Sequence, residues 1–402
     1  MPDRMLRYAT AMTTGAHGRV TMLVRNPFTN DTRVEREART LTAAGYRVTV
    51  VADGAPGLPT TEERDGVTVK RIARRGPRLP GLRFVTHVWR LRRAVEGTRP
   101  DIVHAHDADA LQSAGPAAAR LRVPLVYDSH ELWLGRTARG RSRLYDWLNR
   151  AWYGLVERRY ARRAALVIVA NPGVAPELER RYGIRGVRHV ANYPVEAEPV
   201  PARDLRSLPD AAAIPAEAPI ILYLGAVMAH RGDEEIVRAL ADVGGAHLVC
   251  LGAAGPHVGA IRTEIQRLGL EGRVHLLPPV PSQEVVPFAG SAAIGVSLVQ
   301  PASLSYRLAL PNKLFQYMAA GLPVVASDFP DVRSVVEGSG AGVVVDPTDV
   351  DAVARALREL LGDPSRARAM GDAGRRAVRE RFNWAEAAAE LLRGYGALEV
   401  AR

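Results

Sequence analysis

Two basic residues stand where the sequence favours the binding of an anion. Pro311 suits the start of a helix and Gly321 can supply the left-handed residue that ends it. Lys313 falls in the first turn, where the partial positive charge of the helix disfavours a cation. Arg231 follows the loop after the apolar run 220–225. We expect an anion beside these two side chains; the alternative is a surface helix with a solvated lysine.

A pair of histidines, His104 and His106, could hold a metal ion if their strand continues, because both would then share one face. Asp107 follows them directly. A catalytic zinc ion also needs a third ligand, and no second histidine cluster occurs among the other eight histidines. We therefore expect no bound metal and no cofactor, with His106 and Asp107 as polar residues lining a cleft.

Short apolar runs must position these residues, and they alternate with helical patterns in two series. The first series has runs at 19–24, 47–52, 101–106, 124–128, 166–170 and 187–191. The second has runs at 220–225, 247–252, 274–277, 294–298, 323–327 and 342–346. Such alternation predicts parallel sheets covered on both faces, with ligands at the carboxyl ends of the strands.

The chain of 402 residues exceeds what one hydrophobic core usually supports. The fold class is therefore α/β, with two doubly wound Rossmann-like domains facing across a cleft. The expected parts are an extension (1–18), a first α/β domain (19–195), a linker (196–218), a second α/β domain (219–380) and a C-terminal helix (381–402) that packs back on the first domain. The linker is expected because 194–219 is rich in Pro, Ala and Glu without a clear period.

The composition is that of an ordinary globular protein, with 47% hydrophobic and 24% charged residues. A net charge of +11 favours anionic partners, although the arginines are spread along the chain. Cys250, the single cysteine, lies in an apolar run and is expected to be a small buried hydrophobe. No signal peptide and no run of about 20 apolar residues is found, so a cytoplasmic protein is expected.

Five motifs occur in an order that resembles the retaining family-4 glycosyltransferases of the GT-B fold. They are Asp31-Thr32-Arg33-Val34, Tyr127-Asp128-Ser129-His130-Glu131, Asn192-Tyr193-Pro194, Gly225 with Arg231-Gly232, and the stretch 311–325. The resemblance extends from about residue 19 to residue 395. The form Pro-Asn-Lys-Leu-Phe-x-Tyr-Met of the last motif is similar to one branch of this family.

The resemblance implies a role for each matching position. Gly225, Arg231, Asn312, Lys313 and Gln316 would bind the donor, with Arg231 and Lys313 on its diphosphate and Gln316 on its ribose.

On the acceptor side, the resemblance places Asn26, Asn30, Asp31 and Arg33 near the donor phosphate and the acceptor, together with His106, Asp107 and Glu131. Asp31 could equally be a helix cap in a polar turn. His130 would contact the sugar or the acceptor as a neutral imidazole and counts with Arg231 and Lys313 as a catalytic residue; the alternative is a histidine that only holds its loop.

Three positions depart from the pattern of the family. Many members carry glutamates at the positions of Leu308 and Gln316, and often an arginine at the position of Ala226. Gln316 can still bond to ribose hydroxyls, but less strongly than a carboxylate, and Leu308 cannot contact the sugar through a hydrogen bond.

The segment 139–163 alternates apolar residues with arginines. An amphipathic basic helix of this kind can lie on an anionic membrane, which would place the protein at the inner face of the membrane; it can equally be a core helix with a solvated face. No nucleic-acid-binding module is found.

The sequence thus predicts a metal-independent retaining glycosyltransferase that uses a nucleotide-diphosphate sugar. Its acceptor would be a glycan, a lipid-linked glycan or a small metabolite. The alternatives are a nucleotide-sugar epimerase or hydrolase of the same fold, and a non-catalytic protein that binds sugar nucleotides.

Overall fold

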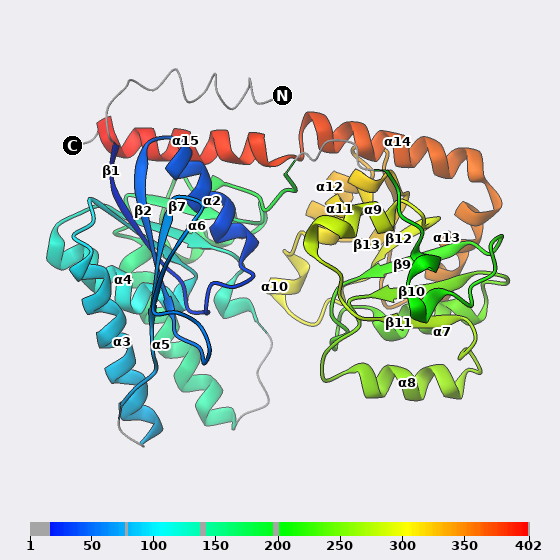
Figure 1. Cartoon of the computed structure of the whole chain (residues 1–402), viewed down its shortest axis with the longest axis horizontal. Coiled ribbons are helices and arrows are strands. Elements are labelled where there is room, and N and C mark those ends of the chain that lie inside the picture. Colours follow the sequence, from blue (N-terminus) through cyan, green and yellow to red (C-terminus); the bar gives the residue numbers. More distant parts are fainter. Residues whose placement is uncertain (1–16, 77–78, 137–141, 196–200, 401–402) are drawn as a thin grey trace. The chain divides into compact units, whose positions relative to one another are not determined.

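The computed structural model describes residues 17–76, 79–136, 142–195 and 201–400 (Figure 1). The chain forms two compact units, Met1–Asn192 with Ala385–Arg402, and Tyr193–Trp384. Each unit is a Rossmann-like α/β domain, which confirms the predicted fold class. The C-terminal helix α15 (Trp384–Val400) thus belongs almost entirely to the first unit.

The first domain is built on an eight-stranded sheet in the order β3-β4-β2-β1-β5-β6-β7-β8. Its strands are β1 (His17–Leu23), β2 (Tyr46–Asp53), β3 (Thr61–Arg64), β4 (Val67–Ile72), β5 (Ile102–His106), β6 (Leu125–Ser129), β7 (Leu166–Val169) and β8 (Arg188–His189). All pairs are parallel except β3 with β4. Residues of β5 and β6 are all buried, as expected for strands covered by helices on both faces.

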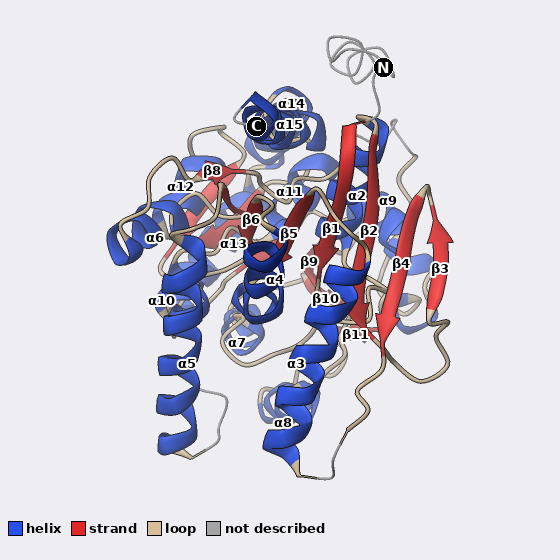
Figure 2. Cartoon of the chain, turned by 90° about the vertical axis from the view of Figure 1, so that its left-hand side faces the viewer, coloured by secondary structure: helices blue, strands red, loops and turns tan. Residues whose placement is uncertain are grey.

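The helices of the first domain are α2 (Thr32–Ala43), α3 (Pro80–Gly97), α4 (Ala108–Leu121), the 3₁₀ turn η1 (Trp133–Gly135), α5 (Arg143–Ala161) and α6 (Val174–Tyr182), besides α15. α3, α4 and α5 stand out as separate rods in Figure 2. α3 was not predicted from the sequence.

The second domain has a six-stranded parallel sheet in the order β11-β10-β9-β12-β13-β14. Its strands are β9 (Ile220–Leu224), β10 (His247–Leu251), β11 (Val274–Leu277), β12 (Ile294–Ser297), β13 (Val324–Ser327) and β14 (Gly342–Val345). Its helices are α7 (Asp233–Ala241), α8 (Val258–Arg267), η4 (Ser282–Glu284), α9 (Val285–Ala289), α10 (Leu304–Arg307), α11 (Asn312–Ala320), α12 (Pro330–Val336), α13 (Val350–Gly362) and α14 (Pro364–Glu380). Cys250 on β10 is free and buried, as predicted.

The segment 196–218 was expected to be a linker, but its described part, from residue 201 onward, packs on the second domain. Residues 196–200 lie outside the described residues. Two short 3₁₀ turns, η2 (Leu205–Ser207) and η3 (Pro209–Ala211), occur here. Leu205 of η2, Ala211 of η3 and the following Ile214 are buried in the core of the second domain. Together with the partly buried Leu208, these apolar residues are spaced three apart, which is what a 3₁₀ turn needs to present one face to a core. The Pro- and Ala-rich composition concealed this spacing.

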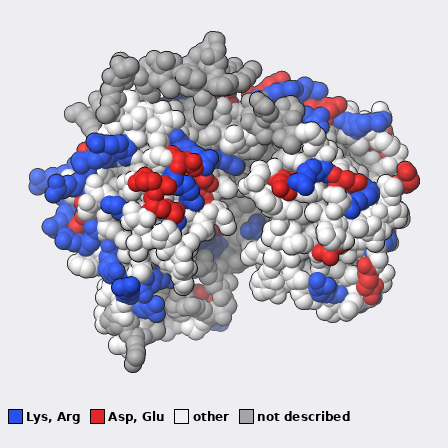
Figure 3. All heavy atoms as spheres, viewed as in Figure 1, with Lys and Arg blue, Asp and Glu red and all other residues white. Residues whose placement is uncertain are grey.

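Basic and acidic side chains are interspersed over much of the face seen in Figure 3. The described residues contain no helix that is both long and apolar enough to cross a membrane. The predicted extension 1–18 lies outside the described residues up to residue 16.

Candidate active site

The donor-side residues lie at the carboxyl edge of the second sheet, where the strand order reverses between β9 and β12. Loops from neighbouring strands diverge at such a point and leave room for a ligand. Gly225 follows β9 with φ of 109°, which favours glycine. No atom lies within 4 Å of where a Cβ would stand, so a ligand can approach this backbone closely.

Helix α11 begins and ends as its sequence predicts. Pro311 is the N-cap with φ of −65°, and Gly321 closes the helix in the left-handed region with φ of 77°. The ammonium of Lys313 lies 3.7 Å from the centre of the Tyr223 ring on β9. Burial lowers the pKa of Lys313 to about 7, Asp233 opposes this effect, and the charge of Arg231 adds to it.

Arg231 and Lys313 are therefore close enough for their charges to interact. The guanidinium of Arg231 lies 4.9 Å from the centre of the Tyr306 ring. Asp233 is the carboxylate that acts on Lys313, and among the described residues neither cation forms a close ion pair. The two positive charges together therefore favour an anion such as a diphosphate. Within the part of the chain that the structure describes, the side chains of Asn312 and Gln316 on the same helix make no hydrogen bond, so both are available to a ligand.

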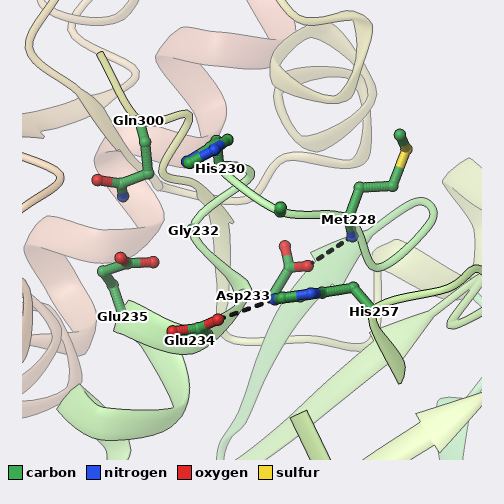
Figure 4. Close-up of a pocket in the computed structure, with 9 residues that line it drawn as sticks. Met228, His230, Gly232, Asp233, Glu234, Glu235, His257 and Gln300 are labelled. Carbon is green, nitrogen blue, oxygen red and sulfur yellow. Dashed lines mark hydrogen bonds and ion pairs between the residues drawn. The ribbon is translucent and has the colours of Figure 1, made fainter. Parts of the chain in front are cut away.

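A cavity of about 150 Å³ opens beside this loop (Figure 4). It is lined by Met228, Ala229, His230, Gly232, Asp233, Glu234, Glu235, His257 and Gln300. Asp233 accepts a hydrogen bond from the backbone N–H of Met228 at 2.8 Å, and His257 pairs with Glu234 at 2.8 Å. Carboxylates repel a diphosphate, so this cavity suits hydroxyl groups of a ligand better than its phosphates.

Apart from Gly232, sequence reasoning missed the residues that line this cavity. The acidic run directly after Arg231-Gly232 was a usable signal, because acidic residues are favoured in the first turn of a helix and α7 begins there. His257 and Gln300 come from other loops, and nothing near them in the sequence points to this cavity.

In the first domain, three strands end next to one another, and their loops carry the acceptor-side residues. β1 lies between β2 and β5, and β6 follows β5. After β1, Asp31 caps α2 by accepting a bond from the N–H of Val34, and its other oxygen accepts one from Asn26 at 2.7 Å. Asn30 is exposed at the tip of this loop. The capping interpretation of Asp31 therefore describes its contacts in this structure.

His130 lies between two carboxylates at the ends of β5 and β6. Its Nε2 is 3.1 Å from Asp128 and its Nδ1 is 3.6 Å from Asp107, which also accepts a bond from the backbone N–H of His130 at 3.0 Å. Burial alone would lower the pKa of His130, but the two carboxylates outweigh it and raise the pKa to about 10. The two carboxylates thus favour the imidazolium form of His130, whereas a neutral imidazole was expected from the sequence.

Asp107 has φ of 68°, in the left-handed region that a residue with a Cβ seldom adopts. Strain of this kind persists where the surrounding structure holds it, and it concentrates at functional sites. Here it directs the Asp107 carboxylate toward His130. Glu131, which follows His130 in the sequence, forms an ion pair with Arg136.

Arg33 is buried, with 4% of its surface exposed. It donates two hydrogen bonds to Asp128, at 2.7 and 2.8 Å, and one to the carbonyl of Val190 at 2.6 Å. It also pairs with Glu37 at 3.2 Å. Its guanidinium is therefore directed at the protein, where it holds the Asp128 carboxylate that contacts His130.

His104 and His106 stack at 4.2 Å between ring centres, as their shared face predicts. Together with Glu37 and Asp128 they could offer four ligand atoms within 4.8 Å of one another. The guanidinium of Arg33 already forms two bonds with Asp128 and an ion pair with Glu37, so a cation would have to compete with it. These residues therefore fit a resident metal poorly.

Comparisons with known proteins identify the family of the chain. The sequence profile of Glycosyltransferase Family 4 matches residues 31–193, and that of Glycosyl transferases group 1 matches residues 206–377. A D-inositol 3-phosphate glycosyltransferase of Xylanimonas cellulosilytica is 31% identical over 307 residues, 73% of this chain and 71% of the relative. The chain belongs to the family-4 type of glycosyltransferases, and it is homologous to inositol-phosphate glycosyltransferases.

Two solved structures show the same fold. A sucrose-phosphate synthase of Thermosynechococcus elongatus has a TM-score of 0.76 at 21% identity, covering 96% of this chain and all of its own. Alr3699/HepE of Anabaena, solved in complex with UDP-glucose, has a TM-score of 0.73 at 16% identity, covering 95% of this chain and all of its own. These similarities confirm the predicted GT-B fold. The two family models and the 31% identical relative confirm the prediction that the protein is a glycosyltransferase.

Proposed function

We propose that this glycosyltransferase takes its sugar from a nucleotide-diphosphate sugar, retains the anomeric configuration and needs no metal. The observation that carries the proposal is the pair of Arg231 and Lys313 at the carboxyl edge of the second sheet. Transfer breaks the bond between the anomeric carbon and the diphosphate oxygen, which leaves negative charge on the diphosphate. Two fixed cations can stabilise that charge in place of a metal ion.

The remaining residues would position the two substrates. Gln316 and Asn312 offer free hydrogen-bonding groups on the same helix as Lys313, and we assign Gln316 to the ribose. His130, held as a cation, would donate a hydrogen bond to a sugar hydroxyl or to a phosphate oxygen, and would not act as a base. The loop of Asn26 and Asn30 is assigned to the acceptor.

We assign the removal of the acceptor proton to the leaving phosphate. The acceptor oxygen forms the new bond on the face from which the diphosphate departs, and its proton passes to a phosphate oxygen. The name of the 31% identical relative makes an inositol phosphate the first acceptor to test. We further propose that the reaction is cytoplasmic and that α5, which covers 143–161 of the expected segment 139–163, meets a membrane. Residues 139–141 of that segment lie outside the described residues.

Thermal shift with UDP, GDP, dTDP and ADP tests the donor site. At least one nucleotide should stabilise the wild type. Arg231→Ala should lower the affinity for that nucleotide by about tenfold or more, because a charge-assisted hydrogen bond is lost. Arg262→Ala, an exposed arginine on α8, is the matched control and should change nothing. If no nucleotide stabilises the protein, the donor proposal fails; if Arg231→Ala leaves the shift intact, the assignment of Arg231 fails.

The stereochemistry and the role of metal need an active pair of substrates. With the donor identified above and an acceptor present, NMR of the first-formed product should show the anomeric configuration of the donor sugar, and a chelator should leave the rate unchanged. An inverted product or a chelator-sensitive rate would contradict the proposal. Sugar released without any acceptor would instead support the hydrolase interpretation.

A further inference from the structure

Exposed large apolar side chains of the described residues gather on two helices of the first domain. Eleven of the fourteen lie on α3 and α5 or at the start of α3. They are Leu79, Leu82, Phe84, Val85, Trp89, Leu144, Tyr145, Trp147, Leu148, Trp152 and Leu155. They include three of the five tryptophans of the chain. Single exposed apolar residues are ordinary, but a cluster of this size marks an interaction site.

On α5 the apolar residues form a stripe that faces away from the domain. Leu144, Leu148 and Leu155 are four and seven residues apart, so they share one side of the helix, and all are more than half exposed. The opposite side of α5 packs on the domain, since Tyr153 and Val156 are buried there. The outer stripe therefore has no partner among the described residues of this chain.

On α3 the same arrangement recurs. Leu82, Val85 and Trp89 are three and four residues apart and exposed by 49, 60 and 59%. The inner side of this helix carries the fully buried Leu91 and Val95.

Both helices pack against α4, which places the two stripes on one side of the domain. Trp152 of α5 donates a hydrogen bond to Gln112 of α4 at 3.3 Å. The neighbouring Ser113 donates one to the carbonyl of Val88 on α3 at 3.0 Å. In Figure 2, α4 lies between α3 and α5, and in Figures 1 and 2 both outer helices extend beyond the strands in the same direction.

The charge around the two stripes is basic. α3 carries four arginines and a single glutamate. α5 carries Arg143 and Arg150, both exposed, and two more arginines in its last turn. Basic side chains also appear in Figure 3 on the side of the first domain where α3 lies in Figure 1. Arginines bordering tryptophan and leucine are typical of helices that lie in the interface of an anionic membrane.

We propose that α3 and α5 together form a docking surface for an anionic lipid membrane. The alternative occupant, a second copy of the chain, is disfavoured because two copies of this arginine-rich surface would repel each other. An anionic lipid surface can bind both the apolar stripes and the arginines. Its acyl region accommodates the tryptophans and leucines, and its phosphates pair with the arginines. The surface extends the membrane contact proposed for α5 to α3, and it does not depend on which sugar the enzyme transfers.

Vesicle flotation of the full-length protein tests the proposal. The protein should float with vesicles of phosphatidylcholine mixed with phosphatidylglycerol, less so at high salt, and should not float with phosphatidylcholine alone. Tryptophan fluorescence should shift to shorter wavelength on binding, because Trp89, Trp147 and Trp152 leave water.

Two sets of variants separate the apolar from the basic contribution. One carries Trp89→Gln, Trp147→Gln and Leu148→Gln, and the other carries Arg143→Glu and Arg150→Glu. Each set should weaken binding to anionic vesicles by about tenfold or more. Leu304→Gln, at an exposed leucine of the second domain, is the control and should bind like the wild type.

Three results would overturn the proposal. These are no binding to anionic vesicles, binding that neither set of substitutions reduces, and lipid-free self-association that the Trp and Leu substitutions abolish. The last result would assign the surface to a second copy of the chain. Circular dichroism and the nucleotide thermal shift of every variant check that it is folded and that its donor site is intact, so failure here is distinct from failure of the proposed reaction.

Discussion

Lys313 carries a charge that depends on whether an anion is bound. Without a ligand, burial and the nearby Arg231 lower the pKa of Lys313 to about 7, against the opposing effect of Asp233. A bound diphosphate would stabilise the ammonium and raise this pKa again. Binding of the donor and protonation of Lys313 should therefore be coupled.

We expect the affinity for the nucleoside diphosphate that stabilises the protein to fall as pH rises above 7. In the free protein Lys313 loses its proton through that range, so binding must take up a proton, and affinity should fall by at most about tenfold per pH unit. Isothermal titration calorimetry in two buffers of different ionisation enthalpy measures the proton uptake directly.

Lys313→Arg is the matched variant, because arginine stays charged throughout this range and should bind with little dependence on pH. Lys313→Met should bind weakly at every pH. The coupling would be refuted if the wild type takes up no proton on binding at pH 8.

Some properties of the residues in this site could be predicted from the sequence, and others could not. Pro311, Gly321 and Lys313 follow local rules, because caps and helix dipoles act within one turn. The charge state of His130 could not be predicted, since it depends on Asp107 and Asp128, whose distances to His130 are set by the register of β5 against β6.

At the scale of elements, the donor site depends on where β9 and β12 separate. Their last paired residues are Tyr223 and Val296. Just beyond, the hydroxyl of Tyr317 on α11 accepts a hydrogen bond from the N–H of Leu224 at 2.8 Å and donates one to the carbonyl of Val296 at 3.0 Å. One side chain thus joins both strands to the helix that carries Lys313.

We expect Tyr317→Phe to lower the free energy of unfolding by about 1–3 kcal/mol. The change leaves a buried N–H and a buried carbonyl without partners while the ring still fills its space. Urea unfolding measures the loss, and the affinity for the nucleotide should fall as well, because α11 is no longer tied to the end of β9.

Tyr306→Phe makes the same chemical change at a half-buried tyrosine whose ring contacts Arg231. It should lower the free energy of unfolding by less than about 0.5 kcal/mol. Equal losses in the two variants would show that the hydroxyl of Tyr317 has no special role.

The same contrast between local and distant information holds for whole elements. Strand runs and the α11 helix were predicted from periodicity and caps. The core position of Leu205, Ala211 and Ile214 was not, because a Pro-rich composition also occurs in turns packed on a core. The segment of α3 was left without a prediction, and its exposed stripe became visible only with the fold.

At the scale of the whole molecule, the first domain is discontinuous in sequence. Its last element, α15, follows the complete second domain in sequence. The backbone N–H of Trp384, the first residue of α15, donates a hydrogen bond to the carbonyl of Pro194 in the second domain at 2.8 Å. The rest of α15 belongs to the first domain. Tyr395 is fully buried and its hydroxyl is 2.9 Å from Nδ1 of His104, while Glu390 pairs with Arg188 at 2.6 Å.

We expect a chain that ends after Trp384 to lose stability in its first domain alone. The truncation exposes the core that Tyr395 covers and leaves His104, whose pKa burial holds well below its ordinary value, without that partner. Calorimetry should show a lower melting temperature for the first domain, whereas the transition of the second domain should still rise when the nucleotide is added, since its site lies within 193–384. Tyr395→Phe in the full chain should reproduce part of the effect, about 1–3 kcal/mol, by removing the hydroxyl alone. If the nucleotide-sensitive transition falls as far as the other one, α15 stabilises both domains and the division at residue 384 does not describe how the chain unfolds.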